Sequence, residues 1–263
     1  MKIGLDTSSK KFPCPACGKK RFVRYFNFDS REYFPEKYGR CDREMSCGYH
    51  NSIGNYLKGQ NQSFNYLPTV TRSYVFSKID NKAVSQSIDL TAPNYFVDFL
   101  KRLFDTATVK KLIKDYQLGT SNHWNGSTIF WQIDEKKDVR SGKILLYNPK
   151  TGKRVKKPYN YINWYHKTAK LKSFELRQCL FGMHLVQNYP QKPIAVVESE
   201  KTAIIMSAVM PESLWLATGS LSNLKPSLFY SILDRKIILY PDTSLPNNNR
   251  QTCFELWQDK TEK

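Results

Sequence analysis

Apolar residues in the middle of the chain follow two different patterns. Residues 94–104 and 106–119 carry them at helical spacing, which predicts two helices, the second closed by the glycine at its end. Residues 127–133 and 143–147 are short apolar runs typical of strands, and the polar stretch 148–154 predicts a turn between two strands. We therefore expect a mixed segment of helices and strands here.

The C-terminal part alternates predicted strands and helices. The apolar, β-branched run 194–197 predicts a buried parallel strand, and Ser199 is placed to cap the helix that follows. Residues 213–220 and 235–242 predict two further strands, with a helix at 225–233 between them. The order strand, helix, strand, helix, strand predicts a parallel α/β sheet.

Four of the six cysteines lie close together near the N-terminus. Cys14 and Cys17 form a CPxCG knuckle, and Cys41 and Cys47 supply a second, more widely spaced pair. Four thiolates, or three with His50 as the alternative ligand, would close a tetrahedral Zn²⁺ site of the structural kind. The other interpretation is a group of small buried thiols.

These patterns predict a domain organisation. Glycine, asparagine, serine and glutamine are dense between residue 59 and about residue 87, which predicts a linker. We expect a zinc-ribbon module at 1–58, a linker at 59–87, a basic mixed α+β segment at 88–190 and an α/β domain at 191–263.

The net charge points to a class of partner. Among 263 residues, 41 are Lys or Arg and 23 are Asp or Glu, which gives a formal charge of +18. This balance favours a polyanion: nucleic acid, an anionic membrane surface or a phosphate-rich ligand. No run approaches the roughly 18 apolar residues of a membrane helix, and the first residues lack the apolar core of a signal peptide. We therefore expect a cytoplasmic protein without a membrane partner.

The charge is concentrated between Lys136 and Arg177, where thirteen basic residues face two acidic ones. Tyrosines and a tryptophan are interleaved with them, as in grooves that bind single-stranded nucleic acid. The alternative is a solvated basic surface over an aromatic core. A basic and aromatic stretch at 21–28 permits the same two interpretations. The predicted nucleic-acid-binding residues are Arg21, Arg24, Arg140, Lys143, Arg154, Lys156, Lys157, Tyr161, Trp164 and Lys201.

Two carboxylates follow predicted strands of the C-terminal part. Glu198 comes directly after the first strand and Asp242 ends the third. The carboxyl ends of parallel strands meet at one edge of a sheet, so the two would lie close together. Oxygen ligands of this kind favour Mg²⁺ or Mn²⁺, with Glu200 as a further candidate ligand. The alternative is a set of solvated loop carboxylates.

The motifs VVESEKTA, ATGS and LYPDTS, in this order, resemble the Toprim domain of bacterial-type primases, topoisomerases and related nucleases. The resemblance implies that Glu198 is the acid/base or metal-associated glutamate and Asp242 the first metal-binding aspartate. The cysteine pairs followed by CGYHNSIGNYL resemble the zinc module of bacterial replicative primases. KLIKDYQLGTSNHW, STIFWQID, KKPYNYIN and QCLFGMHLV fall in the order of the first half of a primase catalytic core. Toprim proteins of mobile elements are closer still.

The sequence departs from the Toprim pattern at two points. The second aspartate of the family's Asp-x-Asp is Ser244, which adds no charge and predicts an impaired two-metal site. Only 21 residues follow Asp242, enough for a loop and a helix at 250–260, so we expect a parallel sheet that ends early or is truncated.

The resulting hypothesis is a primase-like nucleotidyltransferase that makes short primers on single-stranded DNA, with nucleotides as substrates and a replicative helicase as a further partner. The alternatives are a non-catalytic zinc-containing DNA-binding protein of a mobile element and a Toprim nuclease.

Overall fold

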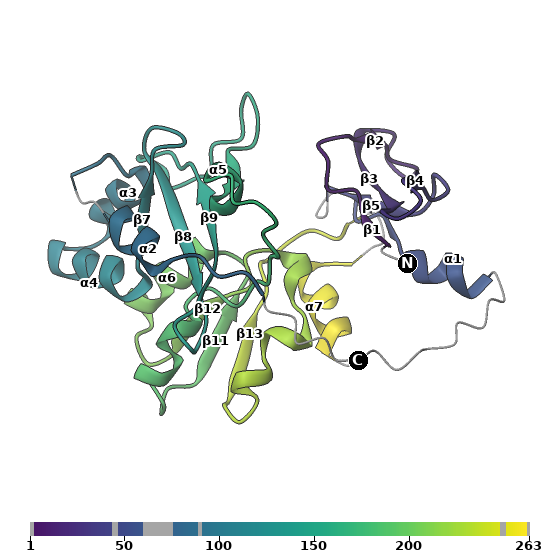
Figure 1. Cartoon of the computed structure of the whole chain (residues 1–263). Coiled ribbons are helices and arrows are strands. Elements are labelled where there is room, and N and C mark those ends of the chain that lie inside the picture. Colours follow the sequence, from purple (N-terminus) through teal and green to yellow (C-terminus); the bar gives the residue numbers. More distant parts are fainter. Residues whose placement is uncertain (1–2, 44–46, 60–75, 89–90, 248–250, 262–263) are drawn as a thin grey trace. The chain divides into compact units, whose positions relative to one another are not determined.

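The computed structural model describes residues 3–43, 47–59, 76–88, 91–247 and 251–261 (Figure 1). They form two compact units. One joins Met1–Ser73 with Pro241–Lys263, and the other is Tyr74–Tyr240.

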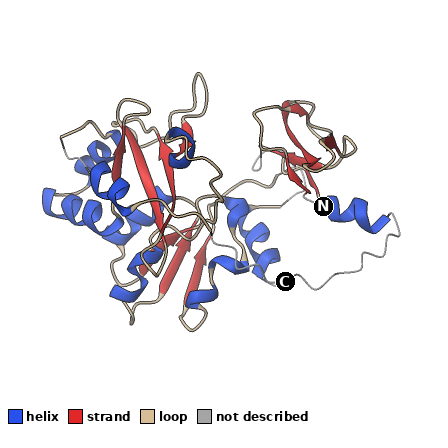
Figure 2. Cartoon of the chain, in the orientation of Figure 1, coloured by secondary structure: helices blue, strands red, loops and turns tan. Residues whose placement is uncertain are grey.

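A small antiparallel sheet forms the N-terminal unit. Its longest strand, β3 (Lys20–Asn27), is the basic and aromatic stretch of the sequence, and it pairs with four short strands. Figure 2 shows these strands joined by loops. The other strands are β1 (Ile3–Leu5), β2 (Phe12–Pro13), β4 (Glu32–Tyr33), β5 (Gly39–Cys41) and β6 (His50–Asn51), and β6 pairs with β5.

Two helices belong to the same unit, α1 (Ile53–Gly59) and α7 (Cys253–Thr261). The predicted C-terminal helix is confirmed as α7, which buries Cys253 and Trp257. Its first backbone N–H, that of Cys253, donates to the Ser244 hydroxyl at 2.9 Å. Ser244 thereby satisfies one of the donors that a helix start leaves without a partner.

The central unit contains a four-stranded antiparallel sheet in the order β10-β9-β8-β7. Its strands are β7 (Gly119–Ser121), β8 (Ser127–Ile133), β9 (Val139–Leu145) and β10 (Ile162–Trp164). Its helices are α2 (Asn81–Ser87), α3 (Tyr95–Leu103), α4 (Thr106–Tyr116) and α5 (Tyr165–Thr168). The helices predicted at 94–104 and 106–119 and the strand at 127–133 are confirmed.

The two faces of this sheet differ in chemistry. On one face, Trp131 and Ile144 pack with Ile79 and Val84 into an apolar core. On the other face, β8 and β9 contribute alternate residues that include buried polar side chains, with Gln132 opposite Ser141 and Phe130 opposite Lys143. Phe130 also packs on Phe181, with ring centroids 5.8 Å apart. This second face carries the polar groups of the candidate site.

A three-stranded parallel sheet completes the central unit, in the order β12-β11-β13. Its strands are β11 (Ile194–Val197), β12 (Leu214–Ala217) and β13 (Ile237–Tyr240). Helix α6 (Glu200–Val209) connects β11 to β12, and Ser199 caps it as predicted by accepting from the Thr202 N–H at 3.1 Å. Short 3₁₀ turns are η1 (Met183–Asn188), η2 (Leu221–Asn223), η3 (Pro226–Leu228) and η4 (Tyr230–Ile232).

Two local predictions are wrong. Residues 225–233 form the 3₁₀ turns η3 and η4 instead of a helix, because the three-residue spacing of Phe229 and Ile232 serves a 3₁₀ turn equally well. Helix α4 is closed by Gln117 at φ +48°, and Gly119 instead begins β7. A Cβ on Gly119 would lie 2.2 Å from the Ser87 Oγ, so close packing explains this glycine.

Two segment boundaries also differ from expectation. The predicted linker is shorter, because Ile79 and Val84 are buried and residues 81–87 form α2; residues 60–75 lie outside the described residues. Strand β9 begins four residues before the predicted 143. The apolar pattern did not indicate these first residues because Arg140 and Ser141 are polar, although Ser141 is fully buried. Within the described residues, no helix has both the length and the apolar character needed to cross a membrane.

Candidate functional site

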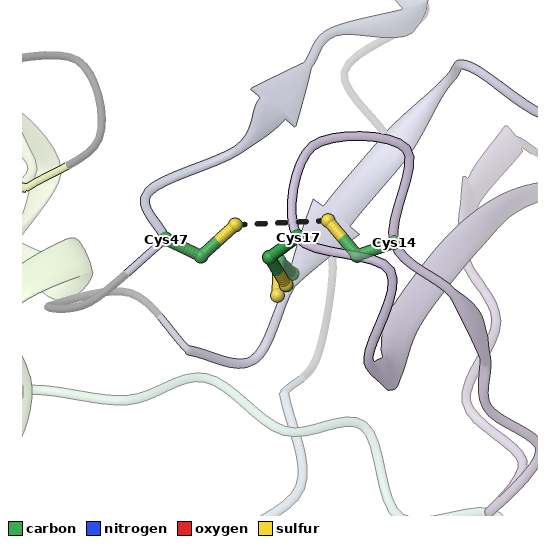
Figure 3. Close-up of side chains that lie close together, drawn as sticks. Cys14, Cys17 and Cys47 are labelled. Carbon is green, nitrogen blue, oxygen red and sulfur yellow. Dashed lines mark hydrogen bonds between the residues drawn. The ribbon is translucent and has the colours of Figure 1, made fainter.

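Four cysteines of the N-terminal unit converge on one point. The sulfur atoms of Cys14, Cys17, Cys41 and Cys47 all lie within 4.8 Å of one another. Figure 3 shows the Cys14 and Cys47 side chains pointing toward each other, with their sulfur atoms 3.6 Å apart. A tetrahedral zinc site with Zn–S bonds of about 2.3 Å places its sulfur atoms about 3.8 Å apart. The cluster therefore fits a structural Zn²⁺ ion.

The environment of the thiols is consistent with this interpretation. Burial raises the pKa of Cys41 to about 12 and also raises the pKa of Cys47, whereas the Lys19 backbone N–H lowers the pKa of Cys17 to about 6. Zinc binds thiolates, so the ion would supply the positive charge that buried thiolates need. His50 is not part of the cluster: it is exposed, and its Nε2 lies 3.1 Å from the Tyr25 hydroxyl. The four-cysteine set is thus favoured over the set with His50.

The two predicted nucleic-acid contacts on β3 have different surroundings. The Arg21 side chain is exposed. The Arg24 guanidinium lies over the rings of Phe12 and Tyr33, 5.0 and 5.2 Å from their centroids, and donates to the Phe34 carbonyl at 2.6 Å. Arg24 is therefore part of the packing of the unit, while Arg21 is available to a partner.

In the central unit, Glu198 follows the last residue of β11, the middle strand of the parallel sheet. The register pairs Val197 with Ala217 and with Tyr240, so three strand ends lie side by side at this edge. Glu198 is 8% exposed. Glu198 thus stands at the carboxyl end of the middle strand, and functional groups of parallel sheets commonly lie at such strand ends.

Glu200, the first residue of α6, has a different role. It is 1% exposed, and its two carboxylate oxygens accept from the Lys143 ammonium at 3.1 and 3.3 Å. Lys143 also donates to the Gly219 carbonyl at 2.6 Å. The Lys143 ammonium, which comes from β9, therefore neutralises Glu200. It also joins the start of α6 to the loop after β12. Burial raises the pKa of Tyr147, and the nearby negative charge of Glu200 raises it further.

Gly219 is required at this junction. Its φ is +81°, and a Cβ here would lie 3.1 Å from the Glu200 Oε1 and 3.8 Å from both the Lys143 Nζ and the Gln132 amide nitrogen. The preceding residue is held in place because the Asn223 side chain donates to the Thr218 carbonyl at 2.8 Å. The glycine of the ATGS motif thus leaves room for the Glu200–Lys143 pair.

Asp242 is the second residue after β13, and it falls in the compact unit that contains the cysteines. Its pairing with Glu198 stays a prediction. Ser244, in place of the second aspartate, is used as the hydrogen-bond acceptor for α7.

The predicted nucleic-acid contacts of the central unit separate into two groups. Arg154, Lys156 and Lys157 are exposed, and Tyr161 is half-buried on the same loop. The others have partners within the unit. Arg140 donates to Asp134 at 2.6 Å, Lys143 is held as described, Lys201 donates to the Gly152 carbonyl at 3.1 Å, and the half-buried Trp164 lies 6.4 Å from the His166 ring. The first group forms the exposed basic loop, residues 154–161.

Comparison with protein families assigns the central part of the chain to a family. The model of a family described as a domain of unknown function, DUF6371, matches residues 94–243. The chain belongs to the DUF6371 family. The match begins at the residue before α3 and ends just after β13, so it covers both sheets of the central unit. A zinc beta-ribbon finger model matches residues 1–62 of this DUF6371 protein, in agreement with the cysteine cluster.

Among curated proteins no match is found. Among solved structures, the primase fragment of the bacteriophage T7 primase-helicase protein is similar, with 16% identity and a TM-score of 0.37, over 96% of this chain and 83% of that one. Structural overlap this low does not establish a shared fold or activity.

Sequence reasoning missed two features of the site. One is the burial of Lys143 against Glu200, for which the sequence of β9, VRSGKIL, gives no local signal. The other is an aromatic group beside the basic loop, where Trp124 and Tyr159 join Tyr161 from two separate segments.

Proposed function

We propose that this chain is a primase-like nucleic-acid-processing protein that makes short primers on single-stranded DNA by metal-dependent nucleotidyl transfer. In this proposal residues 191–263 act as a Toprim-type domain and the zinc ribbon helps to engage the template. The substrates are nucleotides, a replicative helicase is a further partner, and the protein acts in the cytoplasm as part of a mobile element.

One observation carries the proposal. Glu198 directly follows the middle strand of a parallel sheet with the order β12-β11-β13, and Gly219 follows the neighbouring strand β12. The glutamate and the glycine of the motifs VVESEKTA and ATGS therefore stand beyond neighbouring strand ends, as expected if those motifs serve one site. Glu200 also limits which residue fits at position 219, because a Cβ on Gly219 would lie 3.1 Å from the Glu200 Oε1.

In this proposal the candidate oxygen ligands hold one divalent cation and not two. Glu200 is already neutralised by Lys143, and Ser244 offers a hydroxyl in place of a carboxylate. Glu198 and Asp242 are then the proposed ligands of Mg²⁺ or Mn²⁺, since hard cations favour carboxylate oxygens. When bound, such a cation would supply positive charge against the negative charge of a transferring phosphoryl group. The residues of the chain orient the reactants and hold the strand through the exposed basic loop.

The first test is a primer-synthesis assay with single-stranded DNA, labelled nucleotides and Mg²⁺ or Mn²⁺. Glu198→Gln keeps the shape of the side chain but removes its charge, and we expect a loss of product of at least about 100-fold, as for other electrostatic catalytic groups. Glu212→Gln is the matched control, because Glu212 is an exposed glutamate between α6 and β12 of the same unit. Equal activity of the two variants would contradict the role of Glu198.

Ser244 favours a second candidate function, a zinc-containing protein that binds DNA without catalysis. The hydroxyl of Ser244 serves α7, so this position already has a structural use. Ser244→Asp separates the two, because an aspartate can still accept from the Cys253 N–H while it adds a carboxylate. A rise in primer synthesis of about tenfold or more supports a weakened catalytic site; unchanged inactivity with intact DNA binding supports the binding protein. Strand cleavage without synthesis would instead indicate a Toprim nuclease.

A further inference from the structure

An aromatic group lies beside the β10 edge of the four-stranded sheet. The rings of Tyr159 and Tyr161 are stacked, with centroids 4.4 Å apart and planes at 24°. Trp124, from the turn between β7 and β8, meets Tyr161 edge-on at 5.2 Å, and His123 lies 4.3 Å from Trp124. A contact of 2.9 Å between His123 Nε2 and the Asn163 amide nitrogen also joins the two segments. We call Trp124, Tyr159 and Tyr161 the aromatic platform.

The platform is anchored at one end and exposed at the other. Trp124 packs against the apolar core formed by Trp131 and its neighbours. Tyr159, at the far end, is 55% exposed, although one face of its ring is covered by Tyr161. In contrast, Tyr147 of the same segment is buried and Tyr165 packs on Trp131. The platform therefore presents one large aromatic ring to a partner on a fixed support.

Cations precede this ring in the chain. Arg154, Lys156 and Lys157 are all exposed and lie two to five residues before Tyr159. Within the part of the chain that the structure describes, none of the three forms an ion pair. An exposed aromatic ring that follows unpaired cations within five residues of the chain matches the two chemical groups of a nucleotide chain, a base and its phosphate.

We infer that the aromatic platform stacks an unpaired base of single-stranded nucleic acid on Tyr159, while the cations of the basic loop contact the adjoining phosphates. The inference rests on the proposed function and names which part of the nucleic acid is recognised. In a duplex the faces of the bases are covered by their neighbours, so the platform selects single strands. A second copy of this chain is disfavoured as occupant, because each copy carries a formal charge of +18.

The test compares two oligomers of equal length and charge, oligo-dT and an abasic phosphodiester oligomer. Stacking on an aromatic side chain contributes about 5- to 150-fold in affinity per base. We therefore expect Tyr159→Ala to weaken binding of oligo-dT by about tenfold and to leave binding of the abasic oligomer unchanged. Tyr159→Phe, which keeps the ring face, should bind oligo-dT as the wild type does. Tyr230→Ala is the matched control, since Tyr230 is a 67% exposed tyrosine elsewhere in the unit.

Each other result overturns a defined statement. If Tyr159→Ala equals the wild type on oligo-dT, or weakens both oligomers equally, base stacking on Tyr159 is wrong while nucleic-acid binding stands. If the wild type binds neither oligomer at low salt, the proposed function falls together with this inference. As an internal check, Lys156→Ala with Lys157→Ala should weaken binding of both oligomers and reduce the dependence on salt.

Discussion

In the N-terminal unit all four predicted cysteine ligands meet within 4.8 Å, whereas two of the predicted carboxylate ligands, Glu198 and Glu200, have different surroundings in the central unit. Glu200 is neutralised by Lys143, while Glu198 keeps its predicted place at a strand end. Ser244, which stands at the position of the Toprim pattern's second aspartate, accepts a hydrogen bond from a helix. The difference reflects chemistry. A cluster of buried thiols has few uses besides a metal, while a buried carboxylate can be satisfied by an ammonium group as well as by a cation.

The largest expected effect concerns the cysteine cluster. Cys47→Ser should abolish zinc binding and unfold the small antiparallel sheet, because zinc contributes about 10–16 kcal/mol in comparable zinc-finger peptides. Zinc content per chain and backbone NMR spectra of the N-terminal unit measure the result. Cys179→Ala, outside the cluster, is the control and should keep its zinc. A folded N-terminal unit in zinc-free Cys47→Ser would show that packing alone holds the ribbon together.

The next effect tests whether the Glu200–Lys143 pair is structural. Lys143→Met leaves a buried carboxylate without its counterion and should lower the free energy of unfolding by about 3–5 kcal/mol. Urea unfolding measures it, with Lys157→Met, an exposed lysine, as the control. The double variant Lys143→Met, Glu200→Leu should recover most of the loss, since an apolar pair often replaces a buried ion pair without cost. A small loss in the single variant would contradict the role of this pair.

The smallest expected effect is a loss of unfolding free energy when one glycine in each unit is replaced by alanine. Gly219→Ala places a side chain at φ +81° and 3.1 Å from the Glu200 Oε1, and Gly18→Ala creates a similar φ, +66°, with nothing within 4 Å of its Cβ. Backbone strain of this kind costs about 1–2 kcal/mol. We expect the loss of unfolding free energy in Gly219→Ala to exceed that in Gly18→Ala because Glu200 must also shift. Equal losses would mean that the Glu200 carboxylate moves aside freely.

Much of this arrangement could be predicted from the sequence where a pattern has one physical solution. The apolar run at 194–197 became the middle strand of a parallel sheet, and Ser199 capped the next helix, because both signals are local. The four cysteines likewise met, as the zinc-site interpretation predicted.

The remainder depended on tertiary contacts that spacing does not reveal. Lys143 was predicted to contact nucleic acid as one of many lysines, but only the pairing of β8 with β9 and the position of α6 decide that it is buried. Gly119 was interpreted as a helix cap. The structure instead shows that Ser87 lies too close for any side chain at position 119. Tyr159 lies near Trp124, across 34 intervening positions, because Tyr161 contacts both rings, and no local pattern indicates this.

The hydrogen bond from Lys201 to the Gly152 carbonyl, 3.1 Å long, has a mechanical consequence. Lys201 stands three residues after Glu198, and Gly152 lies in the turn from which the basic loop departs. The bond therefore ties the turn before the basic loop to the first turn of α6, which begins two residues after Glu198. A displacement of that turn would also act on the start of α6.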